Sequence, residues 1–291
     1  MSPGGAQHQL VPYHFQGRRD GYSKLIKCEL SRQLYARRAY VELLEEAIQI
    51  DQDTKTTFWR DAIQKEMSNC WVAFKVLEDK ENIPIGYKWI KCHMIFDIKM
   101  DFTRKAHFVS GGHMMDLPDT ITYSSIVSCD SIRIVFLLAA LNDIDIRACD
   151  IGNAYLNASP REKVYTTAGA ELGSEIQGKN ILIVRALYGL KSSGAAWCSH
   201  LANTLQLLGF TSSLADPDVW YRSACRPDGF EYYEYVLVYV NDLLLLSHQP
   251  DKTMHALETF YHLKGGFAEP TMYLGAQVKK WNFPDSSGKS Y

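Results

Sequence analysis

Apolar residues begin to recur at a helical spacing near Phe58. In the segment FWRDAIQKEM, Trp59, Ile63 and Met67 stand at i, i+4 and i+8, which is one face of a helix. We therefore predict a short helix here and place the start of the globular part at this point. Extended segments are expected to follow at 71–77, 87–100 and 105–112.

The rest of the chain mixes helical and strand patterns without a regular βαβ repeat. An Asp130-Ser131 cap predicts a helix through Leu141. Its inward residues are expected to be Ile134, Leu137, Leu138 and Leu141. Further helices are predicted from about Ser193, with Trp197, Leu201 and Leu208 on one stripe, and from about Lys252 to Leu263. Strands are predicted at 144–150, 181–186, 232–240, 243–247 and 271–281. This mixture favours an α+β fold.

Composition narrows the class of protein. The chain has 291 residues, of which 46% are hydrophobic and 22% are charged, so it is neither disordered nor collagen-like. A chain of this length can bury a core without disulfide bonds. The net charge of −2 excludes a uniformly basic nucleic-acid binder, although a local basic groove remains compatible with it.

The cysteines and the N-terminus bear on location. The 7 cysteines are odd in number and show no CxxC spacing, which favours a reducing compartment. The first residues resemble neither a signal peptide nor a transit peptide, and the apolar runs fall short of the ~18 residues of a membrane span. We expect an intracellular protein, cytoplasmic or nuclear, that is not secreted and has no membrane partner.

Residues 1–50 are predicted to form a basic, partly disordered arm. The segment 16–38 carries Arg18, Arg19, Lys24, Lys27, Arg32, Arg37 and Arg38. Such a run either contacts phosphate backbones or is a solvated, partly helical face. At the other end, residues 282–291 are predicted to be a linker remnant.

Two acidic positions each end an apolar strand. Asp150 follows one strand, and Asn241-Asp242 joins two others in YVLVYVNDLLLLS as a tight two-residue turn. If these strands are neighbours, the two carboxylates meet at one sheet edge. Paired carboxylates suit Mg²⁺, and two such ions can activate a 3′-hydroxyl and stabilise a leaving pyrophosphate.

A purely structural reading of each acid stays open. An Asn-Asp turn and an acid at a strand end are both ordinary features. A metal nuclease would need a third acid, and the nearest one, Asp145, begins the strand whose far end is Asp150. At ~3.3 Å per residue the two are ~16 Å apart, which is too far to share an ion.

From about Trp59 to Trp281, a series of short motifs resembles the reverse transcriptase domain of copia-type retrotransposons. The motifs, in family order, are WRDA with EM, KWIKCHMIFD, RKAHFVSGGH, TYSSIVSCDSIRIVFLLAAL, CDIGNAYLN, VYTTAGAE, RALYGLKSSGAAW, GFTSSLADPDVWY and YVNDLLLLS. The most specific is LYGLK followed six residues later by Trp197. The resemblance implies a right-hand polymerase over residues 51–281, with fingers and a palm built on an antiparallel sheet packed on helices.

The resemblance also implies roles for individual residues. Asp150, Asp242 and position 241 match the catalytic acids, and the Ile151 carbonyl matches a metal ligand. Tyr155 matches the aromatic gate that rejects ribonucleotides by steric clash. The remaining substrate-binding positions are Arg104 and Lys105, which hold the triphosphate, and Gly189 and Lys191 in the loop that shapes the templating-base pocket. Trp197 is read as a core residue, and MYLGAQ (272–277) is either the strand that positions the primer or an ordinary sheet strand.

Three residues depart from the family pattern. The hairpin reads Tyr-Val-Asn-Asp where the family has Tyr-Val-Asp-Asp, so Asn241 supplies no negative charge. His107 stands in place of an arginine, and Ser192, a possible helix cap together with Ser193, stands in place of a glutamine. The loss of several kcal/mol of transition-state stabilisation at the metal slows chemistry by ~10³-fold or more.

These departures lead to the hypothesis of a decayed RNA-directed DNA polymerase with weak or lost activity. Its partners would be an RNA or DNA template with primer and deoxynucleoside triphosphates, and its cofactor two Mg²⁺ ions or Mn²⁺. Three alternatives remain: a working enzyme that tolerates Asn241, a non-catalytic nucleic-acid-binding module recruited by the host, and a folded remnant without a role. The oligomeric state is not predicted.

Overall fold

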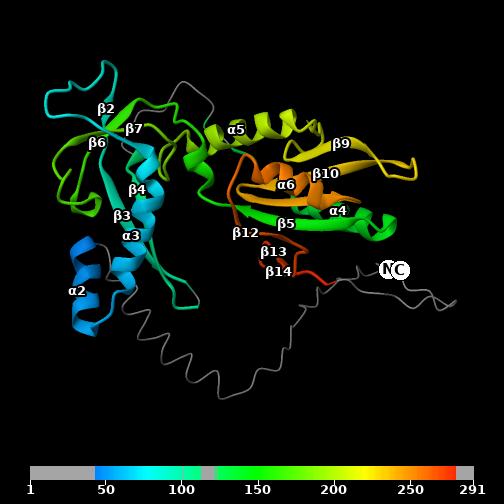
Figure 1. Cartoon of the computed structure of the whole chain (residues 1–291), viewed down its shortest axis with the longest axis horizontal. Helices are drawn as coiled ribbons and strands as arrows, with labels where there is room; N and C mark the ends of the chain where they lie inside the picture. The colour runs from blue at the N-terminus through cyan, green and yellow to red at the C-terminus, as the bar shows by residue number, and fades with distance from the viewer. Residues whose placement is uncertain (1–42, 100, 113–121, 123, 280–291) are drawn as a thin grey trace, which may run out of the picture.

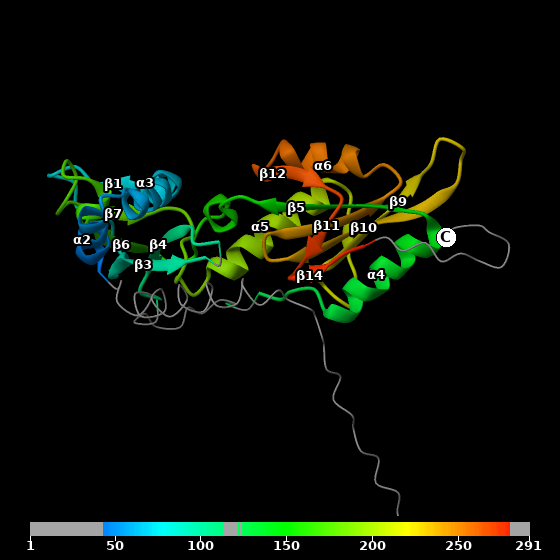
Figure 2. The same ribbon diagram turned by 90° about the horizontal axis from the view of Figure 1, so that it is seen from below.

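The computed structural model describes residues 43–99, 101–112, 122 and 124–279. The predicted basic segment 16–38 and the linker 282–291 therefore lie outside the described residues. The described chain forms an elongated α+β fold with two halves that lie side by side (Figures 1 and 2). Within these ranges, no helix combines the length and the apolar character that crossing a bilayer requires.

The first half is built from two helices, a small sheet and a hairpin. The elements of this half are α2 (Leu44–Thr54), α3 (Phe58–Cys70), η1 (Trp71–Ala73), β1 (Phe74–Val76), β2 (Lys88–Trp89), β3 (Cys92–Ile98), β4 (Arg104–Ser110), β6 (Val164–Thr167), η4 (Ala170–Leu172) and β7 (Asn180–Ile183). The four-stranded sheet has the order β1-β7-β6-β2, and β3 pairs with β4 in a hairpin.

The expected face of α3 is confirmed, because Trp59, Ile63 and Met67 are all buried in the core of this half. The helix begins against α2: the buried Asp51 carboxylate accepts hydrogen bonds from the backbone N–H groups of Trp59 and Arg60. Such a carboxylate satisfies donors that the first turn of a helix leaves free. Residue 50, where the arm was predicted to end, thus lies inside a helix that packs on the globular part.

The second half is built on a six-stranded antiparallel sheet of order β12-β5-β11-β10-β9-β8. The predicted hairpin of two apolar strands is confirmed as β10 and β11. The elements are α4 (Cys129–Asn142), β5 (Asp145–Ile151), η3 (Ala154–Asn157), α5 (Ser193–Leu207), β8 (Thr211–Ser212), β9 (Val219–Cys225), β10 (Glu231–Tyr239), β11 (Asp242–Ser247), α6 (Pro250–Glu258), β12 (Leu263–Ala268), β13 (Met272–Tyr273) and β14 (Ala276–Gln277).

Helices cover both faces of this sheet, with α6 on one side and α4 on the other (Figure 2). The run of four leucines in β11 fits this arrangement because a strand covered on both faces is apolar at every position. Leu243 and Leu245 pack towards α5 and α6, whereas Leu244 and Leu246 pack towards α4.

The predicted face of α4 is wrong. Ile134, Leu137 and Leu141 are exposed, and the helix instead buries Val135 and Ala139 against the sheet. Residues 134–141 of this helix are all apolar, so periodicity does not distinguish the faces there. The cap is also different, because the Ser128 hydroxyl, two residues before the predicted Asp130, accepts from the Ser131 N–H at 3.1 Å.

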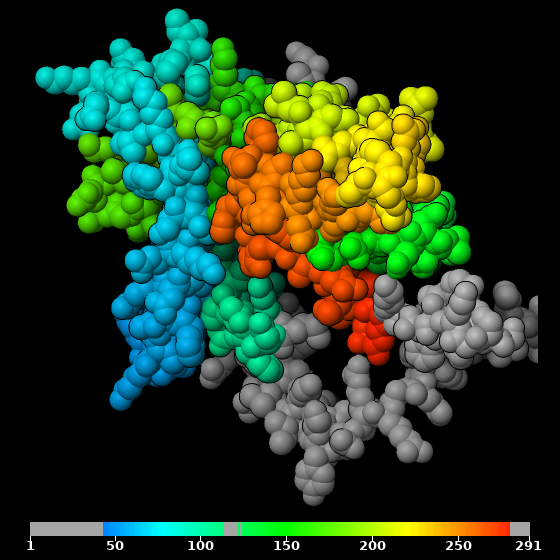
Figure 3. All heavy atoms as spheres, turned by 45° about the vertical axis from the view of Figure 1, so that its right-hand side comes forward, coloured from blue at the N-terminus to red at the C-terminus, as the bar shows by residue number. Residues whose placement is uncertain are grey.

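Two C-terminal predictions also need correction. The helix predicted to reach Leu263 ends at Glu258, and Leu263 begins β12. The single strand predicted over 271–281 is a short hairpin of β13 and β14. In the space-filling view, the β3–β4 hairpin (teal) and the β12–β14 segment (orange to red) project towards the same side of the molecule (Figure 3).

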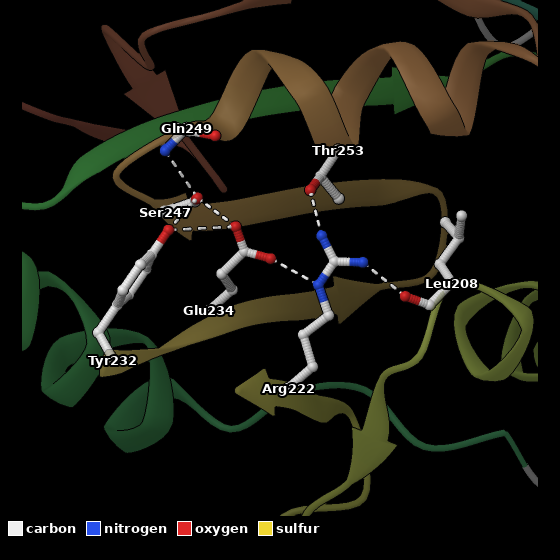
Figure 4. Close-up of polar contacts among 7 residues, drawn as sticks. All are labelled: Leu208, Arg222, Tyr232, Glu234, Ser247, Gln249 and Thr253. Carbon is white, nitrogen blue, oxygen red and sulfur yellow. Dashed lines mark hydrogen bonds and ion pairs between the residues drawn. The ribbon is translucent and has the colours of Figure 1, made fainter. Parts of the chain in front are cut away.

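A buried polar cluster ties the second half together (Figure 4). Arg222 Nε of β9 lies 2.6 Å from Glu234 Oε2 of β10, and Arg222 also donates to the Leu208 carbonyl and to Thr253 of α6. Glu234 in turn accepts from Ser247 of β11. One ion pair therefore connects three strands to the ends of two helices.

Candidate active site

Asp150 and Asp242 lie directly opposite each other on the paired strands β5 and β11. Directly opposed residues in an antiparallel pair share a face, with Cβ atoms about 4.5–5.5 Å apart. Because Leu243 packs towards α5 and α6, the alternation along β11 turns Asp242 to the other face. The two acids from distant parts of the sequence thus meet on one face of the sheet.

The turn of the hairpin is one residue earlier than predicted. Tyr239 pairs with Asp242, so the two loop residues are Val240 and Asn241. Val240 has a φ of 58°, in the left-handed region that a β-branched residue adopts only under strain. Its carbonyl accepts a 2.8 Å hydrogen bond from Trp197 Nε1, and the predicted core position of Trp197 is confirmed by complete burial. The core of the second half therefore anchors this turn.

Both carboxylate oxygens of Asp150 have donors from this chain. Asn241 Nδ2 donates to Asp150 Oδ1 at 2.6 Å, and Lys264 Nζ of β12 lies 3.1 Å from Asp150 Oδ2. Since an ionised carboxylate only accepts, the Asn241 amide must present its N–H to it. Ile151, which is fully buried, donates its backbone N–H to the Asn241 carbonyl at 2.8 Å.

The pKa of Asp242 is raised above its ordinary value. Burial is the largest cause, the charge of Asp150 raises the pKa further, and Lys264 opposes the change. The same two acids and burial raise the pKa of the Cys149 thiol to about 12, burial being the largest cause. Two carboxylates that disfavour each other's charge in a half-buried position are stabilised by a cation.

A pocket of about 270 Å³ opens beside the acids. It is lined by both carboxylates, by the β12 residues around Lys264 and by the β13 segment. The Tyr273 hydroxyl in this lining is buried and has no hydrogen-bond partner among the residues that the structure describes. Burial is also the largest cause that raises the pKa of this phenol, followed by the charge of Asp242.

The donor set fits a hard divalent cation only in part. The oxygens of Asp150 and Asp242 are ligands that Mg²⁺ prefers. Among the residues that the structure describes, however, no three His, Cys, Asp or Glu side chains gather at one point. The nearest further group is the Asn241 amide, which is engaged as a donor. The site thus offers two carboxylates where the family pattern implies three.

The two cations expected to hold a triphosphate do not share a face. Arg104 and Lys105 are consecutive in β4, so their side chains point to opposite sides. The Arg104 guanidinium lies 5.5 Å from the centroid of the Trp59 ring, on the core side of the hairpin. Lys105 lies on the other face, with His107 two residues further on.

The LYGLK loop packs on β4 backbone to backbone. Gly189 has a φ of +92°, and a Cβ on it would lie 2.0 Å from the Ser110 carbonyl oxygen, so the expected close approach is confirmed. Lys191 follows, half-buried, in the turn before α5. Neither serine caps α5 through its side chain: Ser192 bonds to Glu162, and the Ser193 hydroxyl donates to the Leu187 carbonyl at 2.6 Å.

Tyr155 lies in η3, just after the strand that carries Asp150. Its ring centroid is 4.8 Å from that of Tyr188 in the LYGLK loop. Tyr188, Lys264 and Tyr273 were not selected from the sequence. Lys264 lies in a strand interrupted by two glycines, which conceals the strand pattern, and a tyrosine has no sequence signal that separates a site from a core.

Most of the chain matches a known protein family. Residues 69–281 match the family described as "Reverse transcriptase (RNA-dependent DNA polymerase)", so the chain belongs to this family. The Retrovirus-related Pol polyprotein from transposon RE1 of Arabidopsis thaliana is 27% identical over 240 residues, which is 79% of this chain and 16% of that protein. The Truncated transposon Ty1-A Gag-Pol polyprotein of Saccharomyces cerevisiae is 34% identical over 169 residues, 55% of this chain and 14% of that protein.

The chain thus spans about a sixth of the length of these curated relatives. The resemblance to copia-type retrotransposon proteins that the motifs indicate is confirmed. The chain is a reverse transcriptase family domain of the kind found in retrotransposon Pol proteins.

Proposed function

We propose that this chain is an RNA-directed DNA polymerase domain whose nucleotidyl transfer is impaired by Asn241. The observation that carries the proposal is the pairing of Asp150 with Asp242, together with the Asn241 amide bound to Asp150. Residues 51–281 would form its fingers and palm, corresponding to the first and second halves of the fold. Its substrates would be an RNA or DNA template with primer and deoxynucleoside triphosphates.

Asp150, Asp242 and the Ile151 carbonyl would hold two Mg²⁺ ions, or Mn²⁺. Such ions, when bound, favour ionisation of the primer 3′-hydroxyl and neutralise the leaving pyrophosphate. The protein's own part is to fix the two carboxylates on adjacent strands and to position the nucleotide. Lys105 would contact the triphosphate, and Tyr155 would occupy the space of a ribose 2′-hydroxyl.

Arg104, Gly189 and Lys191 complete the proposed substrate-binding set. Gly189 acts through its backbone, since any side chain there would displace β4. Arg104 would act from the rim of the hairpin, where its guanidinium also packs over Trp59. Each of these roles is carried over from the motif that the residue matches.

Two properties of Asn241 would impair nucleotidyl transfer: its lack of charge and the orientation of its amide. Asn241 contributes no negative charge, and its N–H occupies one of the two Asp150 oxygens. A cation at Asp150 must therefore compete with this 2.6 Å hydrogen bond and with Lys264 for the carboxylate oxygens. A loss of about 4 kcal/mol of transition-state stabilisation corresponds to the ~10³-fold slower chemistry expected from the sequence.

The test is primer extension by the wild-type chain and by Asn241→Asp, with Mg²⁺ and with Mn²⁺. We expect Asn241→Asp to be faster by about 10³-fold. Mg²⁺ should also raise the thermal midpoint of Asn241→Asp more than that of the wild type, because a ligand stabilises the state it binds. Asn203→Asp, at an exposed position of α5, adds the same charge far from the acids and should match the wild type. Equal turnover of wild type and Asn241→Asp would refute the impairment.

A second candidate function is nucleic-acid binding without synthesis. It is favoured by the two hydrogen bonds that Asp150 accepts from Asn241 and Lys264, because they give each oxygen of this carboxylate a partner from the chain itself. In that case, both the wild type and Asn241→Asp bind template–primer in a salt-dependent manner, and neither extends it. This pattern would reject the polymerase and retain the binding module.

A further inference from the structure

Three aromatic rings form a continuous series from the first half of the fold to η3, which follows the β5 strand. The His107 ring of β4 lies 5.5 Å from the Tyr188 ring, with 53° between the planes. The Tyr188 ring lies 4.8 Å from the Tyr155 ring, with 56° between the planes. These spacings lie within the range in which aromatic pairs attract each other. Tyr188 therefore stands between the hairpin and the proposed gate residue.

The backbone of Tyr188 is fixed to β4 by two hydrogen bonds. Its carbonyl accepts from the Ser110 N–H at 2.8 Å and from the Ser110 hydroxyl at 3.0 Å. A Cβ on Gly112 would lie 2.0 Å from the Gly189 carbonyl oxygen, so the main chains touch on this side as well. Tyr188 thus projects from a rigid joint rather than from a free loop.

The other end of the series is held by α3. His107 Nδ1 lies 3.4 Å from Glu66 Oε1, and the same carboxylate accepts from the Phe108 N–H at 3.1 Å. Glu66 is largely buried, so the position of the imidazole is set by the core of the first half. His107, which was singled out as a departure from the family, is here a packing partner for Tyr188.

We propose that Tyr188 is a positioning residue that holds the Tyr155 ring in place and thereby sets the discrimination between deoxyribonucleotides and ribonucleotides. This inference rests on the proposed function, in which Tyr155 excludes the 2′-hydroxyl. Exclusion by clash requires a ring that cannot move aside. In this fold the restraint comes from Tyr188, which has main-chain support from Ser110.

The location of Tyr188 agrees with this role. The residue is 46% exposed, although its backbone is fixed and its ring contacts two others. Burial raises the pKa of the Tyr188 phenol, and the charges of Tyr155, Glu66 and Asp150 are among the further causes. The phenol is therefore neutral near pH 7 and within electrostatic reach of the proposed catalytic carboxylate.

The experiment compares incorporation of a single deoxyribonucleotide and of its ribonucleotide counterpart in the Asn241→Asp background. The readout is the ratio of the two kcat/KM values. We expect Tyr188→Ala to lower this ratio by about 3- to 10-fold, in keeping with a ring pair worth about 0.7–1.4 kcal/mol. Tyr188→Phe keeps the ring and should keep the ratio. Tyr233→Ala removes an exposed ring pair on β9 and β10 and should also leave the ratio unchanged.

A double-mutant cycle separates positioning from general loss of structure. Tyr155→Ala alone should lower the ratio more than Tyr188→Ala does. The double variant should then be no worse than Tyr155→Ala, because Tyr188 acts through the ring that is already absent. Additive losses, or a Tyr188→Ala ratio equal to that of Tyr188→Phe, would overturn the inference. A background protein that incorporates no deoxyribonucleotide at all would overturn the proposed function, and the inference with it.

Discussion

The buried ion pair of Arg222 and Glu234 gives the sharpest stability prediction (Figure 4). The two side chains are 25% and 5% exposed. Arg222 has two further acceptors, in Leu208 and Thr253, and its guanidinium packs 4.4 Å from the Phe210 ring centroid. Within the described part of the chain, the other donors to Glu234 are the neutral hydroxyls of Tyr232 and Ser247, so the two members of the pair are not equivalent.

The magnitudes follow from what each substitution leaves behind. Arg222→Leu keeps much of the packing but leaves the Glu234 charge buried without a counter-ion, which costs about 3–5 kcal/mol. Glu234→Gln leaves an arginine that is partly solvated and still has two acceptors. Its cost should be close to that of one charged hydrogen bond, about 2 kcal/mol. Arg222→Leu should therefore be the more destabilising change.

Urea unfolding of both single variants and of the Arg222→Leu/Glu234→Leu double variant measures these differences. The double variant removes both charges together, so it should be less destabilised than the sum of the single changes. The slope of the free energy of unfolding against urea concentration should be the same in all variants, since unfolding exposes nearly the same surface area in each. If Glu234→Gln proves more damaging than Arg222→Leu, or if the effects simply add, the reasoning about buried charge is refuted.

Two further predictions concern the hairpin. Trp197→Phe removes the donor to the Val240 carbonyl and leaves a void in the core. The free energy of unfolding should therefore fall by about 2–3 kcal/mol. An unchanged midpoint of urea unfolding would contradict this. Asp242→Asn should raise the thermal midpoint at pH 7, because the raised pKa of Asp242 means that its charged form disfavours the folded state. This gain should vanish as the pH falls towards the unfolded-state pKa of about 3.9, and a lower midpoint at pH 7 would argue against burial as the dominant cause.

The sequence predicts elements well where one face is clearly apolar. In α3 the apolar residues recur once per turn among polar ones, and the buried face is the expected one. In α4 residues 134–141 are all apolar, so the choice of Val135 and Ala139 as the buried positions depends on the strands beneath the helix. Only tertiary packing determines that choice.

The candidate site was also predictable from the sequence only in part. The strand ends that carry Asp150 and Asp242 could be located from polar residues after apolar runs, but the position of the hairpin turn was predicted one residue too late. The four leucines of β11 are buried on both faces, so a shift of one position leaves the apolar pattern unchanged. Lys264 was missed because its contact with Asp150 depends on the pairing of β12 with β5, which no local pattern reveals.

The bond between Asn241 and Asp150 also bears on how the hairpin tip withstands chelation. Three carboxylates at one sheet edge repel one another unless ions screen them, which links local folding to ion supply. Here an amide and an ammonium group satisfy the central acid from within the chain. We therefore expect the hairpin tip to keep its shape in a chelating buffer.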